Sequence, residues 1–205
     1  MSANKSIENL MVVLRESERA NGQDEILQPT GRTWGTLASG EKFEFFPAWY
    51  EYIGDMHIRF VFDEPASMVG LSVEELSKFN LTPTDAVRIA MSNIGRVYGP
   101  PMAKPWQGHL MTVEGKCPDL DSSYFLARDF WRNLLVRYPE GIVAGVPKRG
   151  GLIFVPLTAT SDVDLLRSKI GWLHSTSENQ RISSALYLFK GDQWTVFQAP
   201  ATMTE

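Results

Sequence analysis

Cysteine and histidine are scarce in this chain, which has one cysteine, Cys117, and three histidines among 205 residues. A single cysteine cannot form an internal disulfide, and a structural zinc site normally takes four ligands from Cys and His side chains. The histidines, at positions 57, 109 and 174, lack the spacing of a zinc motif. We therefore expect no metal site and no disulfide framework.

Long apolar runs and a surplus of basic residues are also missing. No stretch of about 18 apolar residues could span a bilayer, and Glu8 interrupts the apolar residues near the start, unlike a signal peptide. The net charge of −4 comes from 20 basic and 24 acidic residues, which disfavours binding to nucleic acid or to an anionic membrane. These absences predict a cytoplasmic protein that binds neither nucleic acid nor a membrane.

Common catalytic motifs are absent as well. The chain has no Gly-rich phosphate loop, nucleophile elbow, metalloprotease His pair or kinase signature. Hydrophobic residues nevertheless make up 43% of the chain, which is enough to build a folded core without a metal or disulfide. We therefore expect a folded protein with no cofactor and no catalytic residue.

The first 100 residues combine helical and strand patterns. Apolar residues at helical spacing predict a helix over residues 5 to 20, and residues 23 to 40 have the composition of a loop. Residues 43 to 52 are rich in aromatic side chains, which at this density more often build a core than a binding platform. Alternation over residues 57 to 63 predicts a strand. Thr82 and Pro83 have the residue types of a helix start, and this helix should extend over residues 83 to 98.

The second half alternates between strand and helix patterns. We expect a strand over residues 109 to 114, a helix from 125 to 138 and a helix from 161 to 174. Two β-hairpins are predicted with turns at residues 148 to 151 and 190 to 193, because glycine supplies the positive φ angles of tight turns.

These elements predict an α+β fold in which antiparallel hairpins form a sheet with helices packed on one face, either once or as two similar halves. Prolines after Gly99 suggest a boundary, so that residues 1–100 and 101–205 form two halves or one continuous domain. The first half has nine basic and fourteen acidic residues, and the second has eleven and ten.

The C-terminal half resembles the YtpQ-like bacterial proteins, a family without an established activity. The resemblance rests on residues 123 to 126, Trp131, residues 141 to 149 and residues 152 to 156, with a similar helix opening at residues 81 to 87. It implies a bacterial cytoplasmic origin and an α+β fold, and it supplies no catalytic residue.

The leading hypothesis is a non-catalytic protein-binding module, of the immunity type that neutralises a cognate toxin. The acidic first half would suit a basic toxin domain, because complementary charge speeds association. The candidate partner-binding residues are Asp63, Glu64, Glu74, Glu75, Arg128 and Arg132. Arg128 and Arg132 lie one helical turn apart on a polar stripe, which is more commonly a solvated face.

The alternative is an enzyme or a small-ligand-binding protein with a site between the two halves. Its candidate residues are His57, Arg59 and His109. His57 and Arg59 share one strand face and could hold a phosphate or a carboxylate, although a solvent-exposed strand face gives the same pattern. The sequence leaves the oligomeric state open.

Overall fold

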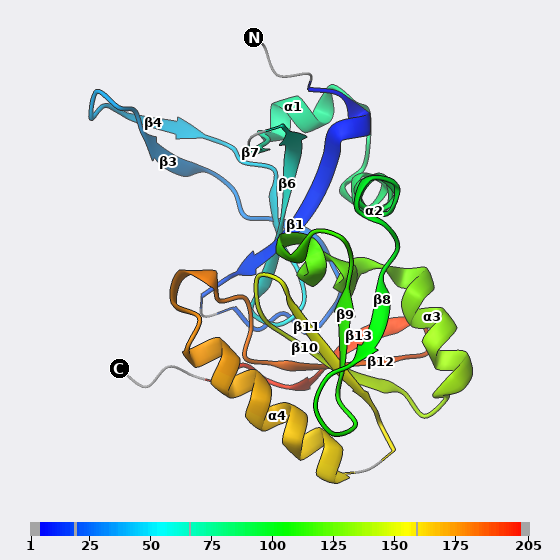
Figure 1. Cartoon of the computed structure of the whole chain (residues 1–205). Coiled ribbons are helices and arrows are strands. Elements are labelled where there is room, and N and C mark those ends of the chain that lie inside the picture. The colour runs from blue at the N-terminus through cyan, green and yellow to red at the C-terminus, as the bar shows by residue number, and fades with distance from the viewer. Residues whose placement is uncertain (1–4, 19, 66, 159, 202–205) are drawn as a thin grey trace.

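The computed structural model describes residues 5–18, 20–65, 67–158 and 160–201, which form an α+β fold with two main antiparallel sheets and a separate ribbon (Figure 1). The first sheet comprises β1 (Leu10–Glu16), β2 (Gln28–Pro29), β5 (Trp49–Glu51), β6 (Met56–Glu64) and β7 (Ser67–Gly70). The second sheet comprises β8 (Met102–Pro105), β9 (Met111–Glu114), β10 (Ile142–Lys148), β11 (Gly151–Pro156), β12 (Leu186–Lys190) and β13 (Gln193–Gln198). Strands β3 (Thr33–Thr36) and β4 (Lys42–Phe45) form the ribbon. The predicted α+β class is confirmed.

The described residues also form four α-helices and three 3-10 helices. The α-helices are α1 (Val73–Ser77), α2 (Pro83–Tyr98), α3 (Arg128–Arg137) and α4 (Thr160–Ser175). The 3-10 helices are η1 (Ile7–Asn9), η2 (Pro118–Leu126) and η3 (Glu178–Gln180). Among the described residues, no helix is both long and apolar enough to cross a membrane.

The predicted N-terminal helix is wrong, because Leu10–Glu16 is strand β1. The five apolar residues from Leu10 to Leu14 are all buried, so both faces of the strand are covered and the apolar run carries no strand alternation. Helix α2 packs against this strand and covers its open edge. There the Asn93 side chain donates hydrogen bonds to the carbonyl oxygens of Ile7 (2.8 Å) and Leu10 (2.9 Å).

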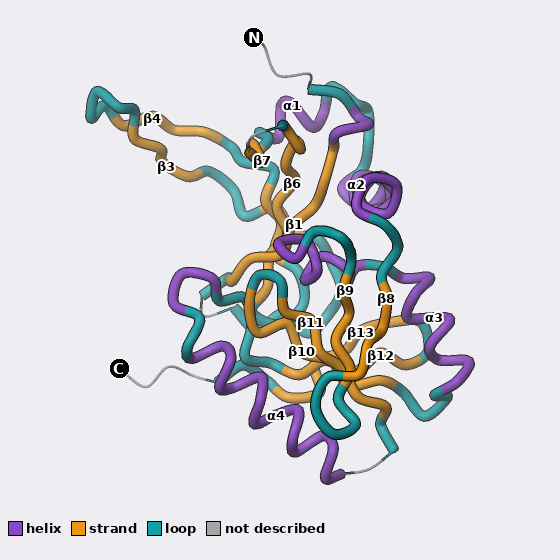
Figure 2. The backbone as a smooth tube through the Cα atoms, viewed as in Figure 1, coloured by secondary structure: helices purple, strands orange, loops and turns teal. Residues whose placement is uncertain are grey.

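Helices cover both faces of the second sheet (Figure 2). Helix α4 packs Leu166 and Ile170 against one face, where Gly145 allows the close approach because a Cβ there would lie 2.6 Å from Ile170. On the other face, the fully buried Trp131 of α3 contacts Phe154 edge to face, with ring centroids 5.6 Å apart.

One hydrophobic core joins the two sheets, although every strand of the first sheet precedes α2 and every strand of the second follows it. Phe125 of η2 stacks on Trp194 at 4.2 Å and meets Tyr52 of the first half edge to face at 6.4 Å. Each such aromatic side chain contributes roughly 2 to 3 kcal/mol through its burial. The core thus extends across the boundary near residue 100.

The aromatic segment 43 to 52 divides between core and surface. Tyr50 and Tyr52 are buried as expected, whereas Phe43 and Phe46 are exposed. The expectation of a core segment is therefore wrong for its first part, because that part enters the ribbon and leaves the sheet.

Candidate functional site

Of the four predicted acidic partner-binding residues, two end strand β6 and two lie in the first turn of α1, and most contact groups of the chain itself. Asp63 accepts a hydrogen bond from the Tyr98 hydroxyl at 2.7 Å. Glu75 closes the capping box of α1 and pairs with Lys5. Glu74 pairs with Lys78 across one helical turn, while Glu64 buries one carboxylate oxygen without a hydrogen-bond partner.

Arg128 and Arg132 begin helix α3, where both engage carboxylates of the chain. Arg128 binds Glu25 with two hydrogen bonds, of 2.7 and 3.2 Å, and Glu25 also accepts from the Tyr52 hydroxyl and from the Trp194 backbone N–H at 2.8 Å. Arg132 binds Asp192 with two hydrogen bonds, of 2.7 and 2.8 Å. Glu25 thus ties the loop after β1 to the second half.

The structure brings His57 and Arg59 together but places His109 elsewhere. His109 lies in the loop before β9, is largely exposed, and has its Nδ1 3.0 Å from the Asp162 carboxylate at the start of α4. Strand β9 runs antiparallel to β11, with Met111 opposite Phe154 and Thr112 opposite Ile153, so His109 lies towards the end of β11 that is remote from the β10–β11 turn. The three residues proposed for a small-ligand site therefore do not form one group.

His57 and Arg59 share one face of β6, as the alternation predicted, and this face is covered. Only 6% of His57 is exposed. Arg59 Nε donates to His57 Nε2 at 2.7 Å, and the Arg59 guanidinium lies over the Trp49 ring, 3.8 Å from its centroid. A backbone hydrogen bond to Glu16 holds the His57 ring from its other side. The imidazole and the indole together fix the orientation of Arg59.

Two further arginines join Arg59 at this place. Arg15 of β1 lies directly opposite His57 in the strand register, and Val13 lies opposite Arg59, so both arginines project from the same sheet face. Arg149 comes from the β10–β11 turn of the second half. Gly150 lets this turn pack on η2, because its φ is +65° and a Cβ would lie 2.7 Å from the Pro118 carbonyl oxygen. We call Arg15, Arg59 and Arg149 the arginine cluster.

Burial, and then repulsion between the positive charges, lowers the pKa of Arg15, Arg59 and His57. Burial and then repulsion from Arg149 and Arg59 lower the pKa of Arg15 to about 10, with Asp119 acting in the opposite sense. Burial and repulsion from Arg149 also lower the pKa of Arg59. Burial and then the charge of Arg59 lower the pKa of His57 to about 4, so its imidazole is neutral at neutral pH.

The sequence pointed to His57 and Arg59 but missed Arg15 and Arg149. Arg15 was placed on a helix, where its position opposite His57 could not be recognised. Arg149 was treated as part of a turn. The missing information was the pairing of β1 with β6 and the packing of the turn on η2, both of which join residues distant in sequence.

The ribbon formed by β3 and β4 is a second candidate site. It projects away from the rest of the molecule (Figure 1). Trp34 is 65% exposed, and Leu37 and Phe43 are also exposed, while Phe46, at the base of the ribbon directly after β4, is 54% exposed. Phe43 packs against Phe45 within the ribbon, with ring centroids 5.5 Å apart. The ribbon thus presents several large apolar side chains on one projecting element.

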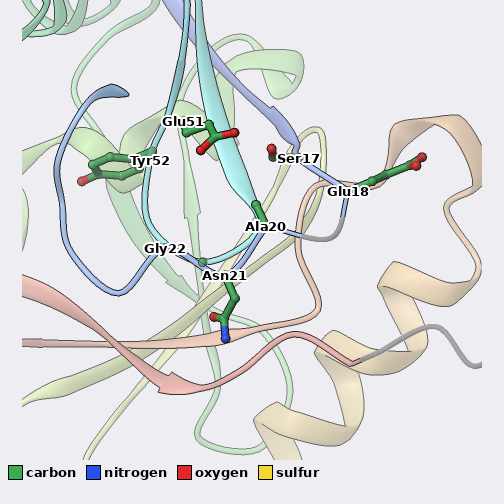
Figure 3. Close-up of a pocket in the computed structure, with 8 residues that line it drawn as sticks. Ser17, Glu18, Ala20, Asn21, Gly22, Glu51 and Tyr52 are labelled. Atoms are coloured by element: carbon green, nitrogen blue, oxygen red, sulfur yellow. The ribbon is translucent and has the colours of Figure 1, made fainter. Parts of the chain in front are cut away.

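An open hollow of about 380 Å³ lies at the opposite end of β5 from the ribbon. It forms where Gly22 and Gly54 exchange backbone hydrogen bonds, and Figure 3 shows Glu51 and Glu18 on separate segments around it. A smaller neighbouring hollow is lined by Asp24 and again by Glu51. Within the described ranges, these three carboxylates make no ion pair.

No group of three or more His, Cys, Asp or Glu side chains in the described part of the chain could hold a metal ion. Cys117 is a free, half-buried thiol, and burial raises its pKa. Neither observation identifies a nucleophile or a metal centre among the described residues.

No protein-family model matches the chain, and neither the curated proteins nor the solved structures include a significant match. The resemblance to YtpQ-like proteins therefore stays a prediction, and the ribbon and the arginine cluster are the two candidate functional sites.

Proposed function

We propose that this chain is a non-catalytic protein-binding module and that the ribbon is its principal contact surface. The observation that carries this proposal is the exposure of Trp34, Leu37 and Phe43 on one projecting element, with the exposed Phe46 at its base. Single exposed apolar side chains are ordinary, but a gathered set favours an interaction site. Tryptophan and other aromatic residues also supply much of the binding energy at protein interfaces.

The partner we propose is a basic protein with an apolar depression that receives the ribbon. Glu51 supports this choice, because it belongs to β5, the strand that follows the ribbon, and its carboxylate makes no ion pair with a described residue. Glu18 and Asp24 lie at the same hollows. A basic toxin domain fits this chemistry, and its neutralisation in a bacterial cytoplasm is the specific form of the proposal.

A small-ligand site between the two halves is the second candidate function. It is favoured by a separate observation: Arg15 and Arg59 share one face of the first sheet, and the β10–β11 turn of the second sheet brings Arg149 near enough to repel both. This site shares no residue with the ribbon.

The protein-binding proposal is tested by affinity capture from lysates of the native cells. The proteins retained by the wild-type chain are compared with those retained by a ribbon variant that combines Trp34→Ala and Phe43→Ala. Trp172→Ala is the matched control, because Trp172 is 60% exposed on α4 and Trp34 is 65% exposed on β3. The captured partner is then purified and titrated against each variant. We expect the ribbon variant to bind about 30-fold or more weakly, as for loss of an interface hot spot, and Trp172→Ala to bind normally.

Three outcomes would overturn the proposal: the absence of a stoichiometric partner, equal retention by the ribbon variant, or a partner without a basic surface. The contribution of acidic charge to association is measured separately. Glu51→Lys should slow association with the partner at low salt, whereas Glu140→Lys, at an exposed position between α3 and β10 of the second half, should leave the rate nearly unchanged.

A further inference from the structure

The arginine cluster carries positive charge that the described part of the chain does not neutralise. None of its three guanidinium groups forms an ion pair with a described carboxylate, whereas five other arginines do: Arg32, Arg88, Arg128, Arg132 and Arg167. Arg15 and Arg59 are also half-buried. Holding like charges together away from water is costly unless an anion compensates them.

The donors of Arg59 are arranged for a ligand outside the protein. Its Nε is used by His57 and its flat face by Trp49, which leaves the two terminal nitrogens without a hydrogen-bond partner among the described residues. Arg15 uses one terminal nitrogen to donate to the Leu14 carbonyl oxygen at 2.6 Å, and its other groups have no described hydrogen-bond partner. Arg149 is exposed, and its backbone N–H is held by the Gln180 carbonyl oxygen at 3.0 Å.

We infer that Arg15, Arg59 and Arg149 form a binding site for the phosphate group of a small molecule, at the junction between the two sheets. Guanidinium groups bind phosphate oxygens through paired, charge-assisted hydrogen bonds. A phosphate carries up to two negative charges and several acceptor oxygens, so it can engage all three arginines, whereas one carboxylate offers one charge and two oxygens. The inference names the ligand class of the second candidate function, on which it rests.

His57 is the positioning residue of this site. As a neutral imidazole it accepts the Arg59 hydrogen bond and adds no positive charge that would repel Arg15 or Arg59. The neighbouring acidic group is Asp119 at the start of η2, which offsets part of the charge of Arg15. Among the described residues, three arginines near the one carboxylate that offsets the charge of Arg15 leave a net positive site.

The experiment titrates the whole chain with inorganic phosphate and separately with phenyl phosphate, by calorimetry and by thermal unfolding. Sodium acetate at matched ionic strength is the control ligand. The variants are Arg59→Gln and Arg149→Gln, with Arg88→Gln as the control variant because Arg88 is an exposed arginine on α2 that pairs with Asp85. If Arg59→Gln fails to fold, Arg149→Gln still tests the site. We expect Arg149→Gln to fold, because the Arg149 side chain is exposed and makes no ion pair with a described residue.

We expect saturable binding of at least one phosphate probe by the wild-type chain and by Arg88→Gln, with a raised Tm. Each folded cluster variant should bind about tenfold or more weakly. Binding of both probes would identify free phosphate as sufficient, and binding of phenyl phosphate alone would assign the site to organic phosphate esters.

The absence of saturable binding, equal binding of acetate, or wild-type affinity in Arg149→Gln would overturn the inference. None of these results would affect the ribbon proposal, whose variants and readout are separate.

Discussion

The imidazole of His57 contacts the backbone of Glu16 and the guanidinium of Arg59, and burial, followed by the charge of Arg59, lowers its pKa and keeps it neutral. Strand alternation was sufficient to place His57 and Arg59 on one face. It could not show whether that face met water, because the covering residues come from elsewhere in the chain. The prediction that His57 and Arg59 share one strand face was confirmed. The burial of His57 could not be predicted, because the residues that cover it are distant in the sequence.

Replacing His57 with Gln should remove a pH-dependent part of the folding stability. The folded pKa of His57 is about 4 and the ordinary value is 6.5, so the unfolded chain takes up a proton first as pH falls. The contribution of His57 to the free energy of unfolding is therefore fully present above pH about 6.5 and is lost as the pH falls towards about 4. Between pH about 7 and about 5, the wild-type chain should lose about 2 kcal/mol more than His57→Gln in urea unfolding.

The groups facing His57 are Arg59, Arg15 and Trp49, none of which changes charge in this pH range. Burial raises the pKa of Asp121 to about 6 and also raises the pKa of Asp55, and both effects oppose the His57 slope. They are present in both proteins, so the difference isolates His57. Parallel pH profiles for the two proteins would contradict the assignment.

Among the elements, those with local chemical signals were predictable. Helix α2 begins at Pro83 after the Thr82 cap as expected, and Ser72 and Glu75 form the capping box of α1. Both C-terminal hairpins form at their predicted turns. Strand β1 was missed because its burial on both faces removes the period of two, and the ribbon was missed because its aromatic residues resemble core residues by type.

Excising the ribbon should leave the fold intact. Joining Gly31 to Phe46 through two glycines removes β3 and β4, whose large apolar side chains are mostly exposed and so bury little surface against the core. We expect the free energy of unfolding to change by less than about 1 kcal/mol. Urea unfolding monitored by circular dichroism measures this change, and a loss of several kcal/mol would show that the ribbon supports the fold.

Across the whole molecule, a few polar side chains link the two halves. Glu25 binds Arg128, and Asp55 accepts hydrogen bonds from Ser183 and from Tyr187, the latter at 3.2 Å. These partners are more than 100 residues apart in the sequence. No local pattern could predict them, because the pairing arises only when both sheets have formed around the shared core.

Changing Glu25 to Gln should therefore destabilise both halves together. The substitution removes the charge that Arg128 faces and weakens the hydrogen bonds from Tyr52 and Trp194, with an expected loss of about 2 to 4 kcal/mol. Urea unfolding should remain a single transition by both fluorescence and far-ultraviolet circular dichroism. Glu44→Gln, which disrupts an exposed ion pair with Arg32 on the ribbon, should cost less than about 0.5 kcal/mol.

Two separate transitions, or equal effects of Glu25→Gln and Glu44→Gln, would show that the halves unfold independently of this link. A single transition with a large loss for Glu25→Gln alone would identify the chain as one folding unit.

The aromatic core also gives the molecule an optical property. The buried rings of Trp131 and Trp194 lie 5.0 Å apart at a steep angle, and Phe125 stacks on Trp194. Indole transition dipoles at this separation couple and produce an exciton pair in the ultraviolet spectrum. The ultraviolet circular dichroism spectrum therefore reports whether η2, α3 and β13 are packed together in solution, without any added chromophore.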